Sequence, residues 1–247
     1  MKTKVVAVLA PFSVVSVASY AQASYPSNSI SIWAGLSLSS ITTPDEIRSL
    51  PDAERDVIVI GYRSGVNLRA SVFLPISGGL GTRLGLGWIQ KGWTLEVDVP
   101  ELPRYDDDYY DDYYDYYDDA SIRSRARANY LSAPALLQFN PTSNVHLLGG
   151  TVFSFALGCS FAATFEVDGI VTERESADCG DDDVDLELTT ADISIMVGAG
   201  VNIPISSALS VSLEAVFDLG MTDFSKVDGD DGSKNKSFGI TAGVSLP

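Results

Sequence analysis

The chain has 247 residues, 45% of them hydrophobic, and a formal net charge of -17. An acid excess of this size repels nucleic acid and anionic membrane surfaces, so we expect no nucleic-acid partner. Beyond the N-terminus, serine or glycine interrupts every apolar run well before the roughly 20 residues that a membrane-spanning helix needs.

The N-terminal segment has the three parts of an export signal. Lys2 and Lys4 precede an apolar stretch at 5–17, and Ala21-Gln-Ala23 follows as a small-residue cleavage site. We therefore expect a signal peptide at 1–23 and one mature domain at 24–247, which is an ordinary length for a single all-β domain. The alternative is an apolar leader that is not cleaved.

Eight apolar segments follow, and the connections between them alternate strictly between two sizes. The alternation of tight turns and long loops is typical of outer-membrane barrels. The sequence predicts an all-β fold: an eight-stranded antiparallel up-and-down transmembrane β-barrel with short periplasmic turns and long extracellular loops, in the outer membrane of a Gram-negative bacterium. The short connections are 75–79, 140–144 and 204–208, and the long ones are about 41–62, 98–125, 166–187 and 223–236.

Within these segments every second residue is bulky and apolar, and the residues between them are small or polar. A soluble barrel of the lipocalin type also alternates, but the polar set here is too small and too sparsely charged for a water-facing exterior. We assign the apolar set to lipid and the glycine and serine set to a narrow interior. The apolar set includes Ile30, Ile32, Leu36, Val66, Leu68, Leu84, Trp88, Leu131, Phe153, Leu157, Phe161 and Phe217, and the other includes Ser31, Asn67, Gly158, Ser194, Gly200 and Ser212.

Four charged residues fall on the inward set: Arg69, Arg83, Glu214 and Asp218. An isolated charge inside a barrel is costly unless it is paired. We expect an interior ion-pair plug, with a proton or ion path as the alternative. Aromatic residues toward the segment ends are expected in the interface girdle. They are Trp33, Trp88, Trp93, Tyr130, Phe139 and Phe165.

The long connections hold 29 of the 33 acidic residues, and the second contains a run made only of tyrosine and aspartate. Like-charge crowding opposes compact structure, so we expect a solvated loop tip. The alternative is a surface interaction patch whose carboxylates, which suit hard cations, bind divalent cations or a cationic protein. Arg123, Arg125 and Arg127 follow and are expected to neutralise part of the run or to pair with lipid phosphates. The run is Tyr105, Asp106, Asp107, Asp108, Tyr109, Tyr110, Asp111, Asp112, Tyr113, Tyr114, Asp115, Tyr116, Tyr117, Asp118 and Asp119.

Cys159 and Cys179 are the only cysteines. An even count in an exported chain permits a disulfide, and both lie toward the long-loop side of the barrel. We expect them to be bonded, with two free thiols as the alternative.

The sequence carries little that points to catalysis. His146 is the only histidine and follows a short turn, so we expect it to be an interface or turn residue. A Ser/His/Asp arrangement would then lie at the periplasmic end of the barrel. There is no Cys/His cluster for zinc and no phosphate-binding glycine loop, so we predict no enzyme, no cofactor and no metal site. A lipid-modifying enzyme is the alternative that substitution of His146 would test.

Several short motifs resemble those of the PorT-like outer-membrane β-barrel family of Bacteroidetes, in order and over about 30–246. The resemblance implies an eight-stranded barrel with periplasmic termini, and one member of the family is associated with protein secretion. Two features differ: Ser132 replaces a usual acidic residue, and the chain ends Val244-Ser-Leu-Pro247 where an aromatic residue is usual. The motifs are Leu84-Gly-Leu-Gly-Trp88, Gln90-Lys91-Gly92, Tyr130-Leu-Ser-Ala-Pro134, Gly149-Gly150, Ala191-Asp192 with Gly198-Ala-Gly200, and Asp218-Leu-Gly-Met-Thr-Asp223.

Together these features predict a non-enzymatic outer-membrane barrel that acts as an envelope scaffold and presents acidic surface loops. The alternative is a binding or protein-secretion-accessory barrel whose loops capture a cationic or divalent-cation-bridged partner. The expected partners are outer-membrane lipid and lipopolysaccharide, and the barrel assembly machinery during biogenesis.

Overall fold

The computed structural model describes residues 28–99, 102–103, 116–117, 120–167, 170–178, 189–223 and 233–246. Eight long strands form the barrel: β1 (Ser29–Ile41), β2 (Ile58–Ser77), β3 (Leu80–Val99), β6 (Ala120–Phe139), β7 (Val145–Val167), β9 (Ala191–Ser206), β10 (Leu209–Asp223) and β11 (Lys234–Leu246). The remaining elements are short: α1 (Asp45–Ser49), α2 (Asp52–Arg55), β4 (Leu102–Pro103), β5 (Tyr116–Tyr117) and β8 (Ile170–Asp178). Within these ranges no helix is long and apolar enough to cross a membrane.

The eight long strands close into a ring. Each pairs antiparallel with its neighbours in the order β1, β2, β3, β6, β7, β9, β10 and β11, and β11 returns to β1. The closing pair runs in continuous register from Ile30 opposite Leu246 to Ile41 opposite Asn235. Closure satisfies the backbone of every ring strand, which is what a sheet surrounded by lipid requires. The predicted eight-stranded up-and-down barrel is therefore confirmed.

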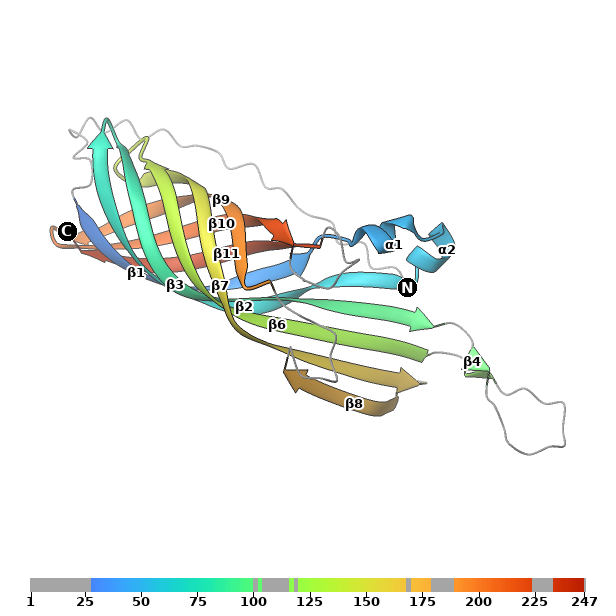
Figure 1. Cartoon of the computed structure of the whole chain (residues 1–247). Helices are drawn as coiled ribbons and strands as arrows, with labels where there is room; N and C mark the ends of the chain where they lie inside the picture. The colour runs from blue at the N-terminus through green and yellow to red at the C-terminus, as the bar shows by residue number, and fades with distance from the viewer. Residues whose placement is uncertain are drawn as a thin grey trace, which may run out of the picture.

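Tight turns join the strands at one end of the ring, where β11 also ends beside the start of β1 (Figure 1). Gly78 and Gly79 have φ of +55° and +82° and connect β2 to β3. Two consecutive residues at positive φ match the right-handed twist of a hairpin, which explains the paired glycines. Asn140, just after β6, donates its side-chain amide to the carbonyl of Gly79 at 2.9 Å and so links two neighbouring turns.

The barrel is apolar outside and polar inside. Ile32 and Leu36 are 69% and 67% exposed, whereas Trp33 between them is 1% exposed. Buried positions on the ring strands include Ser31, Ser37, Asn67, Ser154, Ser194, Ser212 and Thr241. This is the orientation that alternation in the sequence predicts.

At the other end, four neighbouring strands continue past the ring and form a projecting sheet (Figure 1). We define it as 58–62 of β2, 89–99 of β3, 120–130 of β6, 158–167 of β7, and β8, which pairs with β7 alone. The expected long connections at 41–62, 98–125, 166–187 and 223–236 are therefore too long. Their edges belong to strands, and 170–178 is β8, because strand pairing continues where the charge pattern had indicated loops.

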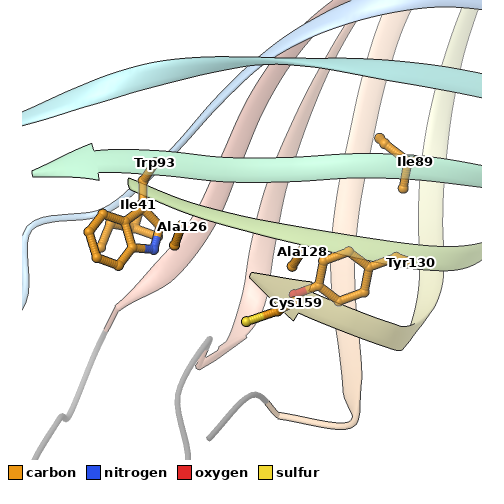
Figure 2. Packing of buried hydrophobic residues seen from close by; sticks show 7 residues of the cluster. All are labelled: Ile41, Ile89, Trp93, Ala126, Ala128, Tyr130 and Cys159. Atoms are coloured by element: carbon orange, nitrogen blue, oxygen red, sulfur yellow. The ribbon is translucent and has the colours of Figure 1, made fainter. Parts of the chain in front are cut away.

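The inner face of the projecting sheet is apolar near its base. Ile41 at the end of β1 lies near Trp93, and Tyr130 lies beside Ala128 and Cys159 (Figure 2). These residues and Ile89 and Ala126 form one buried cluster, with Ile60, Leu95, Ala156 and Phe161 packed against it.

A β-bulge in β7 changes which of its residues face inward. Asn129 pairs with Gly158 and Tyr130 with Ala156, so Leu157 is the extra residue. Because one extra residue reverses the alternation, Cys159 is buried and Gly158 is exposed. The expectation that Phe161 faces lipid and Gly158 faces the interior is therefore wrong.

Candidate functional site

The interior of the barrel contains a group of charges centred on Glu214 of β10. Glu214 is 1% exposed. Its Oε2 accepts a hydrogen bond from Nη2 of Arg69 at 2.9 Å, and its Oε1 accepts one from Nη1 of Arg83. His146 Nε2 lies 2.8 Å from the same Oε1. We call these four residues the Glu214 cluster.

A glycine makes this arrangement possible. Gly200 pairs with His146 on β7 and with Glu214 on β10, so it stands between the two side chains. A Cβ at this position would overlap the imidazole of His146 and come within 2.7 Å of Cγ of Glu214. The contact between histidine and glutamate therefore requires glycine on β9.

The indole ring of Trp33 on β1 lies against both arginines. The guanidinium carbons of Arg83 and Arg69 lie 4.8 and 5.4 Å from the centre of the indole ring. The indole Nε1 donates to Oγ of Ser71 at 3.0 Å, which fixes the ring inside the barrel. Cation–π contact and ion pairing thus act on the same two side chains.

A second group of charges, the Lys91 cluster, lies at the base of the projecting sheet, which contributes Lys91 itself. Nζ of Lys91 on β3 is 3.0 Å from Oδ2 of Asp192 on β9 and 2.9 Å from Oδ2 of Asp218 on β10. Asp192 also accepts hydrogen bonds from Thr222 at 3.0 Å and Asn235 at 3.2 Å. Nζ of Lys91 lies 5.7 Å from the ring centre of Tyr130.

The two clusters have opposite charge balances. The Glu214 cluster sets two guanidinium groups against one carboxylate, and the Lys91 cluster sets one ammonium against two carboxylates. A cavity of about 10 Å³ separates them, bordered by Arg69, Lys91 and Asp218 among others. Such a volume is close to the minimum that a single water molecule requires. A larger cavity of about 160 Å³ opens at the turn end and reaches Arg83.

Three of the four charges expected in the interior meet directly. Arg69 and Arg83 both contact Glu214, but Asp218 does not join them, because it lies farther along β10 and pairs with Lys91. The sequence reasoning missed Lys91 and Asp192. Both share the inward alternation, with Arg83 on β3 and with Ser194 on β9, so the pattern itself was sufficient to find them.

His146 is also placed differently from the expectation. It is 0% exposed inside the barrel and is neither an interface nor a turn residue. The second residue of β7 falls on the inward face, and Glu214 is within hydrogen-bond reach there.

The expected aromatic girdle is wrong for half of its members. Trp33, Trp93 and Tyr130 are 1%, 8% and 1% exposed and point inward, because each falls on the inward alternation of its strand, with Ser31, Lys91 and Ala128 respectively. Phe139 is 45% exposed on the outer face, as expected.

Other expected sites lie partly or wholly outside the described residues. The signal peptide at 1–23, Cys179, and the tyrosine and aspartate run other than Tyr116–Tyr117 are in this group. Cys159 is buried on β7, and because Cys179 lies outside the described ranges the disulfide remains a prediction. In the described ranges, no three histidine, cysteine or acidic side chains gather as a metal site would need.

Comparison with known proteins gives a family and a set of similar folds. The family model of the outer membrane protein beta-barrel domain matches residues 20–226. No curated protein matches the chain. The attachment invasion locus protein Ail of Yersinia pestis is 13% identical over 90% of this chain and 100% of its own, with a TM-score of 0.38. OprG of Pseudomonas aeruginosa is 12% identical over 90% and 96%, with a TM-score of 0.38, and Neisserial surface protein A is 14% identical over 88% and 96%, with a TM-score of 0.36. At this level the likenesses carry no argument about function.

Proposed function

This chain belongs to the outer membrane protein beta-barrel domain family, and we propose that it is a non-enzymatic envelope barrel that works through its outer end. Barrels of this family lie in the outer membrane of Gram-negative cells. The interior serves as a plugged scaffold, and the projecting sheet with its acidic loops meets the surroundings of the cell.

The observation that supports this proposal best is the pairing of charge at two levels of the interior. Glu214 has three partners on three other strands, and Lys91 has two on two others. Each cluster therefore ties together strands that are distant in sequence, and each charged group has a partner. Such an interior favours rigidity over passage of solutes.

Protease shaving of intact cells tests the proposal. Peptides should come only from the loop end, from connections such as 42–57 and 100–119. Fractionation with soluble periplasm, together with gel migration that does not change on heating, would contradict it.

The acid content of the outer end favours a second function, capture of a partner. The loops and strand ends at 41–62, 98–125, 166–187 and 223–236 hold 29 of the 33 acidic residues, so this end of the barrel suits a cationic protein or one bridged by divalent cations. Deletion of residues 105–119 should weaken binding of a basic probe such as polylysine to the purified chain in detergent. Unchanged binding by the shortened chain would exclude this role.

We also propose finer assignments that the resemblance supports. They are membership of the PorT-like group, a bacterium of the Bacteroidetes type, export by a cleaved signal peptide at 1–23, and insertion by the barrel assembly machinery. N-terminal sequencing of the purified protein, expected to begin near Ser24, would test the cleavage.

A further inference from the structure

An unusual column of arginines stands on the outer face of the projecting sheet. Arg127, Arg125 and Arg123 alternate along β6 with Ala126 and Ala128, which are completely buried on the inner face. Register places Gly92, Thr94 and Glu96 of β3 beside them. The three guanidinium groups therefore share the face that, lower on the same strand, points into lipid.

A fourth arginine reaches this column from β2. The register of β2 and β3 shifts between Tyr62 and Asn67, and Arg63 lies in that irregular stretch. A Cβ on Gly92 would lie 3.0 Å from Cδ of Arg63, so the glycine leaves space for the arginine stem to cross β3. Arg63 consequently lies within electrostatic reach of Arg127 and Arg125, whose positive charges repel its own.

Little in the described chain neutralises this column. Glu96 accepts a hydrogen bond from Nη2 of Arg123 at 2.6 Å, which raises the pKa of Arg123 and keeps it charged. Among the described residues, Arg63, Arg125 and Arg127 have no carboxylate partner. Nε of Arg127 is buried without a hydrogen-bond acceptor there. Three like charges held together in this way favour an external anion.

The position of these arginines along the membrane normal indicates which kind of anion they would meet. From Phe139 to Leu131 the outward residues of β6 are mostly apolar. This span of eight residues rises about 20 Å along the membrane normal, at about 3.3 Å per residue and about 40° of strand tilt. Trp88 lies opposite Leu131, and above them Gln90 donates to Asn129 at 3.1 Å. Since the apolar band of such barrels is about 25 Å tall, Arg127 falls about 5 Å above it, at the depth of lipid headgroups.

We propose that Arg63, Arg125 and Arg127 form a binding site for the phosphate of a phosphorylated glycolipid in the outer leaflet. Arg123 is paired with Glu96 and does not take part unless that ion pair is broken. The planar guanidinium groups suit bidentate contact with phosphate oxygens, and the adjoining apolar strands accept the acyl chains. The site shares no residue with the interior clusters or with the acidic run.

Native mass spectrometry of the full chain in detergent, with diphosphoryl lipid A as the probe, tests the proposal. The double variant R125Q/R127Q should bind lipid A at least about tenfold more weakly, since two charge-assisted contacts are lost. R48Q/R55Q removes the same charge from exposed positions on α1 and α2 and should bind like the wild type. Equal binding by wild type and R125Q/R127Q, or an equal loss in R48Q/R55Q, would overturn the site.

Two further arms distinguish a lipid site from a site for free phosphate. Lipid A without its phosphates should bind weakly to the wild type, and millimolar inorganic phosphate should not displace diphosphoryl lipid A; displacement would mean a site for free phosphate. E96Q releases Arg123 and should strengthen binding several-fold, so it gives an answer even if R125Q/R127Q fails to fold. Unchanged or weaker binding by E96Q would count against the proposal.

Discussion

Lys91 and Asp218 form a buried ion pair across the barrel, with Nζ 2.9 Å from Oδ2 and both side chains at most 4% exposed. Their strands, β3 and β10, are not neighbours in the ring. The contact therefore spans the interior and braces the barrel from within.

The Lys91→Met variant removes the only cation of the Lys91 cluster and leaves Asp192 and Asp218 unpaired. Removal of one partner from a buried ion pair costs about 3–5 kcal/mol of unfolding free energy. We expect a loss of this size when the protein is unfolded with urea in detergent and the folded fraction is measured from its heat-modifiable gel migration. Lys236→Met at the rim, where the ammonium lies 5.7 Å from the Tyr62 ring centre, should lose about 1 kcal/mol or less. Similar losses for both variants would refute the bracing role of Lys91.

Glu214→Gln should destabilise the barrel more than His146→Gln. The first change leaves Arg69 and Arg83 without their shared carboxylate, whereas the second removes one of three partners from Glu214. We expect losses of about 3–5 kcal/mol and about 1–3 kcal/mol in the same urea assay. The reverse order would show that the histidine, not the carboxylate, organises the cluster.

Gly200→Ala on β9 and Gly158→Ala on the projecting part of β7 form a matched pair of glycine substitutions in strands. An added methyl at Gly200 overlaps His146 and lies 2.7 Å from Cγ of Glu214, whereas at Gly158 no atom lies within 4 Å. Overpacking of this kind costs about 1–3 kcal/mol. We expect that loss for Gly200→Ala and almost none for Gly158→Ala, measured by thermal gel shift. Equal stability of the two variants would argue against a tight fit between β7 and β10.

Alkylation with and without reductant tests the predicted bond between Cys159 and Cys179. If the bond exists, mass spectrometry should detect labelled cysteines only after reduction. Its removal should lower stability by about 3 kcal/mol, as expected for a loop of roughly 20 residues. Full labelling without reductant would instead establish two free thiols.

The sequence by itself determined that the chain forms a barrel and which residues of each strand face outward or inward. Alternation along the strands separates Ile32 and Leu36 from Trp33 and Ser31, and this pattern depends only on neighbouring residues. The same local rule places Arg69, Arg83 and Glu214 inside, together with Lys91 and Asp192, which the rule indicates but the prediction omitted.

Only the tertiary structure decided which charges meet. Asp218 and Glu214 are four residues apart on β10, yet one faces Lys91 and the other faces two arginines, because pairing depends on ring order and register across the barrel. The bulge at Leu157 and the continuation of β2, β3, β6 and β7 beyond the ring likewise follow from pairing with neighbouring strands. Alternation fixes the face of each residue, but contacts across the interior depend on how the ring closes.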